Sequence, residues 1–408
     1  MIPVALLLAC DSGPTAVETD TVDTSAAVDT GIPDLEEAPP RVPDVIVDCG
    51  GGSDFVTIRE AIAASPSGTK IGLRPCTYVG DIDFIGKSLD IFGIEGSAVT
   101  TIQGSGYGPV VLATHGESVG TRLAGVTITG GATDGYHGSG IGVDFAMVQL
   151  EDVVFTRNDV GLSVLYASGA FIELLDVSFD DNEVDPTGGI TVMTNGSALA
   201  QRMTIDCADA DYGMFMHNAS LLLDSDVDCG RTYGIYNQGN GVHLRRSRVQ
   251  SDGIAVFSED RDDTRNERSF FYNSAMIGGD VAVLSAYTNV HAENNVFWGG
   301  RVGLDLRYVN AQSYVTNSYA WGSECGIQVP YGEVYELGWN AVADGSACAS
   351  GHDTVDLAPG FVGAPDDFTL QANSPLIDAG DPDPDRRDPD GSRNDIGIYG
   401  GREGRGQP

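Results

Sequence analysis

Three arginines near an acidic loop are the residues whose chemistry best suits catalysis. Arg245 and Arg248 lie shortly before the segment "SEDRDDTRNER" (258–268), which contains Arg265 and several aspartates. A β-elimination on a uronic acid needs a base, and a cation that acidifies the proton to be removed. These arginines and carboxylates are candidates for the two roles. The alternative is a solvated face without a catalytic role, where surface ion pairs contribute only ~0–1 kcal/mol.

Acidic side chains also gather near the C-terminus, where calcium binding is the chemistry to consider. Six aspartates fall within 15 residues: Asp381, Asp383, Asp385, Asp388, Asp390 and Asp395. Carboxylates at alternate positions, followed by a turn at "DG", supply the many oxygen ligands that Ca²⁺ prefers. The segment lacks the terminal Glu of an EF-hand, and Arg386, Arg387 and Arg393 could instead neutralise an acidic turn. We expect calcium as the candidate cofactor. The histidines are scattered and indicate no further metal site.

A repeated pattern of Gly, apolar, any, apolar organises the elements that must position these residues. Its nine copies begin at Gly140, Gly161, Gly189, Gly213, Gly234, Gly253, Asp280, Gly303 and Gly326. The steps between copies range from 19 to 28 residues. A coil of about 22 residues is one turn of a parallel β-solenoid, in which neighbouring coils bury each other's apolar side chains. A leucine-rich repeat would need a fixed Leu spacing, and a propeller would need roughly double the period.

A second alternating run precedes each copy, with Asn or Asp often at the turns. Its expected inward column is Ile128, Phe155, Phe179, Ile205, Val227, Val249, Ile277, Phe297 and Tyr319. Alternation with period two is typical of strands with one buried face. The expected turn residues are Asn158, Asn182, Asn273, Asn295 and Asn317.

Six cysteines form three neighbouring pairs at about one coil's spacing. The pairs are Cys49 with Cys76, Cys207 with Cys229, and Cys325 with Cys348, separated by 27, 22 and 23 residues. Equivalent positions in adjacent coils lie ~4.8 Å apart, within the roughly 4.4–6.8 Å between Cα atoms that a disulfide tolerates. Of about 15 possible connectivities, only sequential pairing links adjacent coils. We predict these three disulfides. The alternative is free buried thiols, and no CxxC or His pair supports a zinc site.

The N-terminus has the features of a targeting segment. "MIPVALLLAC" is too short to span a bilayer, and it fits the apolar region of a signal peptide. "LLAC" resembles the lipobox of bacterial lipoproteins, which implies a signal peptide at 1–9 and lipidation of Cys10. An ordinary secretory signal is the alternative. Residues 10–43 are acidic and poor in large apolar side chains, so we expect a disordered tether.

The first coils resemble a known superfamily. "DFVTIREAIAASPSG" offers Thr57 and Glu60 as a capping box and Ile58, Ala61 and Ile62 as the apolar stripe of a short capping helix. This segment and the "SLDIFGIEGSAVTTIQG" that follows are similar to the start of pectin methylesterases, within the pectin-lyase-like superfamily. The resemblance implies an all-β fold, a right-handed parallel β-helix of roughly ten coils over residues 44–375. The esterase, pectate-lyase and polygalacturonase catalytic motifs find no match, so those activities do not carry over.

The C-terminal segment, 376–408, contains "SPLIDAGD" and "DIGIYGG". It resembles the close of many bacterial β-helix surface proteins, in which a final strand finishes the helix. We therefore expect this Asp-rich segment to close the solenoid at its C-terminal end.

Composition narrows the partners. With 22 basic and 59 acidic residues the net charge is −37, which argues against nucleic-acid binding. We expect a monomer in the cell envelope, held at the outer surface by its lipid anchor or secreted, with extracellular polysaccharide as a possible partner. The favoured function is a non-catalytic surface module that contacts glycans or other partners. The alternative is a calcium-dependent polysaccharide lyase, or another carbohydrate-active enzyme, acting on uronic-acid polymers.

Overall fold

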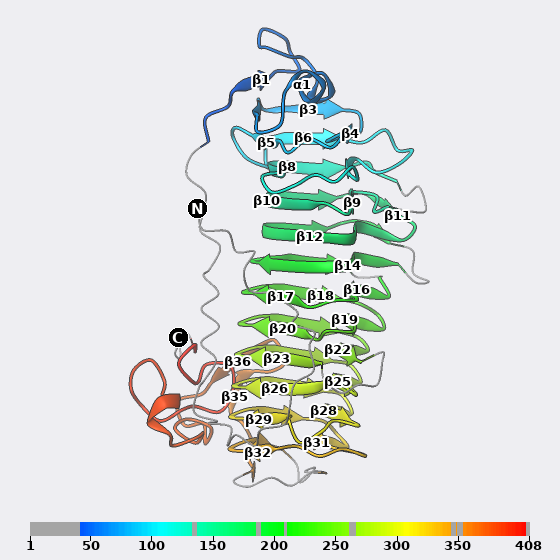
Figure 1. The fold of residues 1–408 in the computed structure, drawn as a ribbon. Helices are drawn as coiled ribbons and strands as arrows, with labels where there is room; N and C mark the ends of the chain where they lie inside the picture. Colours follow the sequence, from blue (N-terminus) through cyan, green and yellow to red (C-terminus); the bar gives the residue numbers. More distant parts are fainter. Residues whose placement is uncertain are drawn as a thin grey trace, which may run out of the picture. The chain divides into compact units, whose positions relative to one another are not determined.

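The computed structural model of this protein is a winding stack of parallel β-strands (Figure 1). It describes residues 41–404 apart from 133–136, 185–188, 208–209, 261–266, 344–347 and 349–353. The described residues belong to one compact unit. A single 32-stranded sheet passes through about twelve turns. The predicted all-β parallel solenoid is confirmed, with about two turns more than expected, because the coils before residue 140 lack the repeated pattern.

Each turn of the solenoid adds one strand to each of up to three rows of parallel strands. We call these the first, second and third row, in the order in which the chain passes through them within a repeat coil. The first row contains β4 (Ile82–Asp83), β7 (Val111–Ala113), β9 (Ile141–Asp144), β12 (Ser163–Asp180), β14 (Ile190–Gln201), β16 (Tyr212–Met216), β19 (Tyr233–Gln238), β22 (Ile254–Glu259), β25 (Val281–Ala286), β28 (Val302–Arg307) and β31 (Cys325–Gln328). The second row contains β1 (Val45–Val47), β2 (Lys70–Leu73), β5 (Asp90–Gly93), β8 (Arg122–Thr129), β10 (Met147–Thr156), parts of β12 and β14, β17 (Ser220–Leu223), β20 (Val242–Arg245), β23 (Arg268–Tyr272), β26 (Asn289–Glu293), β29 (Tyr314–Thr316) and β32 (Glu336–Gly338).

The third row completes each coil. It contains β3 (Cys76–Val79), β6 (Thr100–Gln103), the ends of β8, β10 and β12, β15 (Thr204–Cys207), β18 (Asp226–Cys229), β21 (Arg248–Ser251), β24 (Ala275–Gly278), β27 (Val296–Gly299), β30 (Tyr319–Trp321), β33 (Ala341–Val342) and β34 (Val355–Asp356). A separate parallel pair joins β11 (Asp159–Val160) to β13 (Glu183–Val184).

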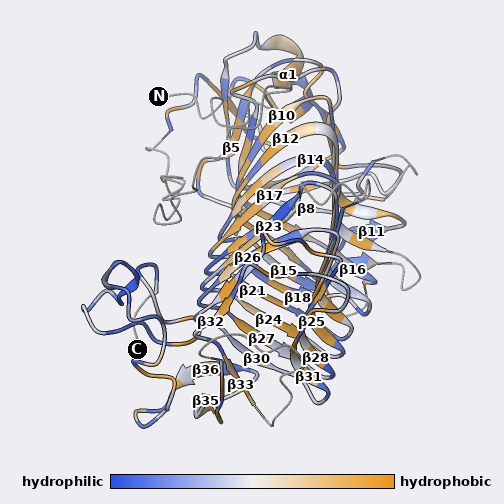
Figure 2. Cartoon of the chain, turned by 60° about the horizontal axis from the view of Figure 1, so that its bottom comes forward, coloured by the Kyte–Doolittle hydropathy of each residue, from blue (hydrophilic) through white to orange (hydrophobic). Residues whose placement is uncertain are grey.

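The core fills the inside of the coils with stacked aliphatic and aromatic side chains, and apolar residues concentrate along the strands (Figure 2). The third-row column runs as predicted from Ile128 through Phe155 to Val249. In the later coils Met276 and Ala320 take the inward places expected for Ile277 and Tyr319.

A polar ladder fixes the corner between the second and third rows. Its members are Ser225, Ser247, Ser274, Asn295, Ser318 and Asn340. Each side-chain oxygen accepts a backbone N–H from the coil before, such as Ser225 N to Ser247 Oγ at 3.1 Å. Each member follows a residue with left-handed backbone, for example Asp224 with φ of 48°. Because these buried N–H groups are paired, the tight corner carries no unsatisfied donor at those positions.

The N-terminal end is capped as predicted. Helix α1 (Ile58–Ala64) begins at Thr57, whose side chain accepts from Glu60 N while the Glu60 carboxylate accepts from Thr57 N. Ile58, Ala61 and Ile62 are buried and join the core of the first coils. Among the described residues, no helix is long and apolar enough to cross a membrane.

The C-terminal segment differs from the expected closing strand. Parallel pairing ends at Asp356, and β35 (Phe361–Gly363) pairs antiparallel with β36 (Asp367–Leu370). Apolar side chains from these strands and from the chain between Leu376 and Ile398 pack against the outer side of the last third-row strands. Trp298 and Trp321 stack there with ring centroids 4.6 Å apart. The 3-10 helix η1 (Pro384–Arg386) also belongs to this segment, and its Arg386 lies 3.8 Å from Glu293 of the second row. The segment therefore covers the side of the solenoid, because an apolar outer face in these coils needs burial.

All three predicted disulfides are present, with Cα–Cα distances of 6.4 Å for Cys49–Cys76, 4.9 Å for Cys207–Cys229 and 5.6 Å for Cys325–Cys348. Only Cys207 and Cys229 are direct register partners on neighbouring strands. The sequential pairing was therefore right, although equivalent strand positions explain one bridge only.

Candidate functional site

Five aromatic side chains form a cluster on the outer side of the first row, four of them stacked and Phe215 edge-on to its neighbours, and we call them the aromatic platform. They are Tyr212 and Phe215 of β16, Tyr233 and Tyr236 of β19, and Phe257 of β22. Tyr212 pairs in register with Tyr233. Phe215 pairs with Tyr236, and Tyr236 pairs in turn with Phe257 on the next strand. Ring centroids lie 5.4 Å apart for Tyr212 and Tyr233 and 5.0 Å apart for Tyr236 and Phe257, whose planes differ by 6°. All five rings are half-buried.

The pleat of the strands puts Phe215, Tyr236 and Phe257 outside. Met214, Ile235 and Val256 point into the core and are fully buried. The next residue in each strand points the opposite way, because side chains alternate along a strand. Parallel strands in register then bring the outward rings of successive coils within stacking distance. These three rings thus follow from the same repeat that builds the core, whereas Tyr212 and Tyr233 lie immediately before the repeat's glycine.

A polar edge adjoins the platform at the end of the first-row strands. Glu259 Oε1 accepts a hydrogen bond from the Tyr236 hydroxyl at 2.5 Å and from Gln238 Nε2 at 2.8 Å. Burial, followed by the bond to Glu259, raises the pKa of Tyr236, so its hydroxyl stays protonated as a donor. At the other end of the strands, Thr232 Oγ1 donates to Asp211 Oδ1 at 3.4 Å.

Such a surface suits ligands with flat apolar faces and polar edges. An aromatic ring has a negative face, which attracts C–H groups and cations. Contiguous half-exposed rings beside hydrogen-bonding groups are typical of binding sites. A sugar ring offers C–H groups on its faces and hydroxyls around its edge, so the platform can stack with it while Glu259 and Gln238 contact the hydroxyls.

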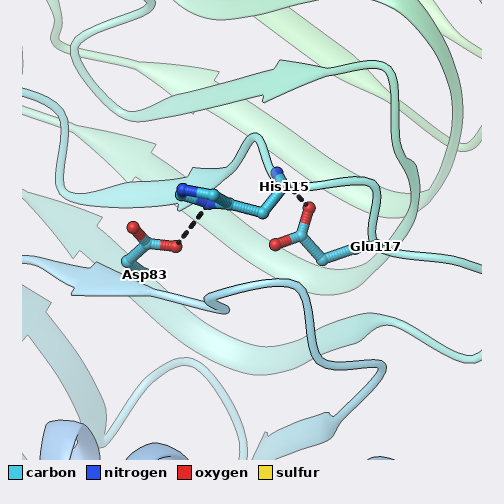
Figure 3. A group of neighbouring side chains, drawn as sticks. All are labelled: Asp83, His115 and Glu117. Atoms are coloured by element: carbon cyan, nitrogen blue, oxygen red, sulfur yellow. Dashed lines mark hydrogen bonds and ion pairs between the residues drawn. The ribbon is translucent and has the colours of Figure 1, made fainter.

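A second cluster lies in the early coils and could hold a metal ion (Figure 3). His115 Nδ1 lies 3.5 Å from Asp83 Oδ1, and ligand atoms of Asp83, His115 and Glu117 fall within 4.8 Å of one another. Glu117 is 1% exposed, and its two oxygens accept from Gly86 N at 2.8 Å and His115 N at 2.9 Å. These two hydrogen bonds satisfy both oxygens of the buried carboxylate, and Glu117 thereby connects two loops without a metal ion.

Two of the three predicted catalytic arginines are engaged by carboxylates. Arg245 forms an ion pair with Glu403 of the C-terminal segment. Arg248 lies 3.1 Å from Asp226 and 3.6 Å from Asp228 on the neighbouring third-row strand. Arg265 lies outside the described residues. Arg245 ends a second-row strand and Arg248 begins a third-row strand, so these two arginines occupy different faces from the platform.

The predicted calcium ligands are spread along the C-terminal segment. Asp381, Asp383 and Asp390 each accept the backbone N–H of the second residue after them, at 2.8–2.9 Å. Asp385 lies 3.3 Å from Arg402.

The other two carboxylates point into the segment itself. Asp388 accepts from Asp395 N and Gly401 N, and Asp395 Oδ1 accepts from Asp378 N. Within the part of the chain that the structure describes, only the Asp83 cluster brings three ligand atoms together. The six aspartates therefore do not converge in this conformation, and calcium binding stays a prediction.

Sequence reasoning missed both the platform and the Asp83 cluster. A signal for the platform was present, since Phe215 and Tyr236 occupy the free third position of consecutive repeats, "GMFM" and "GIYN". Outward positions were interpreted there as a solvated face only. His115 and Asp83 are 32 positions apart, and only the stacking of β4 on β7 brings their loops together.

Comparison with known proteins identifies the fold. No model of a protein family matches the chain, and no curated protein matches it either. Among solved structures, the pectate lyase Pel9A is 14% identical with a TM-score of 0.50, covering 88% of this chain and 96% of that chain. An alginate lyase of the PL6 family is 11% identical (TM-score 0.36; 73% and 52% covered), and a carrot pectin methylesterase is 14% identical (TM-score 0.26; 79% and 91% covered). The likeness to Pel9A shows that the chain has the right-handed parallel β-helix fold.

Proposed function

We propose that this protein is an extracellular β-helix that binds a polysaccharide along its aromatic platform and does not turn it over. The observation that carries the proposal is the cluster of five half-exposed rings across three coils, bordered by Glu259 and Gln238. The fold is shared with a pectate lyase, which supports a carbohydrate-directed role on the same scaffold. The three disulfides are typical of proteins outside the cytosol, where such polymers occur.

Affinity electrophoresis tests the binding. The purified protein migrates through gels that contain one neutral, one acidic or one amine-bearing polysaccharide. We expect retardation in at least one gel, and loss of it in the variant Tyr233→Ala/Phe257→Ala. Tyr308→Ala is the matched control, because Tyr308 also stacks on the surface, with Tyr331, but lies outside the platform. Migration unchanged in every gel would refute a glycan-binding function.

The competing function is a calcium-dependent polysaccharide lyase, favoured by the shared fold alone. It predicts ultraviolet absorbance from unsaturated products on uronic-acid polymers with Ca²⁺, and loss of the signal in Arg248→Ala. A reducing-sugar assay accompanies it, because a hydrolase leaves no double bond. Turnover in either assay would replace the non-catalytic proposal. The same samples test calcium binding, since a Ca²⁺-dependent rise in melting temperature, lost in Asp388→Asn, would support a structural calcium site.

Anchoring through Cys10 is a separate proposal, supported by the "LLAC" sequence. Expression in a bacterium supplied with labelled palmitate should label the wild type and leave Cys10→Ala unlabelled. Equal labelling of the two proteins would rule out lipidation at Cys10.

A further inference from the structure

The charges around the aromatic platform restrict the kind of glycan that fits it. Asp211 immediately precedes Tyr212, Asp252 lies two residues before Ile254, and Glu259 ends the same strand as Phe257. Arg231 is also exposed at this edge and offsets one of these charges. Among these described residues, three acidic side chains therefore face one basic side chain, in a chain whose net charge is −37.

Two further arginines are paired with carboxylates. Arg246 forms a two-bond ion pair with Asp224 at 2.7–2.9 Å, and Arg301 pairs with Asp280 at 2.8 Å. A carboxylate-bearing polymer on the platform would thus meet acidic side chains within about one Debye length, ~10 Å at ordinary salt. It would also face the negative sides of the aromatic rings.

An ammonium group meets the opposite situation. Aromatic faces attract cations, by about 0.5–1 kcal/mol at exposed sites, and Glu259 adds a carboxylate next to the Tyr236 ring. Glu259 uses Oε1 for the bonds to Tyr236 and Gln238, and a carboxylate has four lone-pair sites in all, so it can accept further donors.

We infer that the glycan bound by the platform is an amine-bearing polysaccharide, in which free amino groups lie near Glu259 and the platform rings. This inference rests on the proposed function and adds the chemical class of its ligand. The inference excludes uronic-acid polymers as the preferred ligand, because the platform attracts positive charge and repels carboxylates.

Three oligosaccharides of equal length test the inference by calorimetry. They are a glucosamine oligomer, its fully N-acetylated form and an oligogalacturonide, so that charge is the main variable. We expect the amine form to bind the wild type about 10-fold more tightly than the acetylated form at low salt, with the difference shrinking as salt is raised, and the oligogalacturonide to bind most weakly.

Variants separate the platform from the general acidity of the protein. Tyr233→Ala/Phe257→Ala should weaken the amine form about 10-fold, whereas Tyr308→Ala should leave it unchanged. Glu259→Gln should weaken the amine form about 3- to 10-fold and the acetylated form by a smaller factor, because only the amine form also loses a charge attraction. Equal binding of the amine form to the platform variant, or preference for the acetylated or acidic oligomer, would overturn the inference. Platform-dependent binding of another polymer, with none of these three bound, would also overturn it while leaving the proposed function intact.

Discussion

The glycines of the repeat have a steric role that explains their positions. A Cβ on Gly213 would lie 2.6 Å from Gly234 O, and one on Gly234 would lie 2.7 Å from Ala255 O. Real Cβ atoms do not approach carbonyl oxygens so closely, so the neighbouring coil would have to move. Glycine at the start of a first-row strand therefore permits the close stacking that brings the platform rings into contact.

We predict that Gly234→Ala destabilises the protein by about 1–3 kcal/mol, the usual cost of overpacking a close contact. Thermal unfolding measures the effect. Gly108→Ala is the control, because a Cβ there meets nothing within 4 Å. Equal melting temperatures for the two variants would contradict the steric explanation of the repeat.

The buried carboxylate of Glu117 offers a second test at the residue scale. We predict that Glu117→Gln costs about 1–3 kcal/mol, because the amide NH₂ would face one of the two backbone donors that Glu117 now satisfies. Glu95→Gln, at an exposed position, should be neutral. A Glu117→Gln protein as stable as the wild type would show that these two bonds contribute little.

At the scale of elements, the C-terminal segment is held to the side of the solenoid by an apolar cluster and by buried amides. Asn294 Nδ2 donates to Asn394 Oδ1 at 2.7 Å and to Asp395 O at 2.8 Å. Asp388 lies inside this segment, and burial raises its pKa to about 7. Its ionised form is therefore disfavoured in the folded state relative to the unfolded chain.

The sign of the resulting pH dependence follows from linkage. The folded-state pKa of Asp388 exceeds the ordinary value of 3.8. Between these two pKa values the folded protein therefore binds more protons than the unfolded chain. The contribution of Asp388 to the free energy of unfolding consequently falls as pH rises from about 4 to about 7. We predict that the stability of wild type relative to Asp388→Asn is greater at pH 5 than at pH 8. Unfolding midpoints of both proteins at the two pH values decide this, and a constant difference would contradict it.

Some features of these elements could be predicted from local sequence patterns, whereas the register between coils could not. The rows, the inward face of all but two coils and the cap were predictable because apolar alternation and the Thr57–Glu60 pair are local signals. The register was harder: Val192 pairs with Met214, whereas aligning the repeats would pair Ile190 with Met214. A shift of two residues keeps every side chain on its face, so alternation cannot detect it. The platform was missed for a related reason, since outward residues gain meaning only when the register stacks them.

At the scale of the whole molecule, charge opposes the compact state. A net charge of −37 on 408 residues places like charges on neighbouring strands, as where Asp206 pairs with Asp228 in register. Burial raises the pKa of Asp206, and the nearby carboxylates of Asp180, Asp228 and Asp226 raise it further. The second effect reflects repulsion between these carboxylates. Stacked parallel strands repeat each surface position in every coil, so repulsion of this kind accumulates along a solenoid more than in a globular domain.

We therefore predict that salt stabilises this protein. Raising NaCl from about 10 mM to about 150 mM shortens the screening length from ~30 Å to ~8 Å, and screening should weaken repulsion between the carboxylates more than it weakens the close Arg–Asp pairs. The expected result is a melting temperature that rises between these concentrations. The rise should be smaller in Asp206→Asn/Asp228→Asn, which removes two neighbouring charges of the third row. Comparing NaCl with KCl at equal ionic strength checks that screening is the cause, since the two salts should act alike. A melting temperature that falls with salt would mean that attractive ion pairs, and not the excess of carboxylates, dominate the electrostatics of the folded chain.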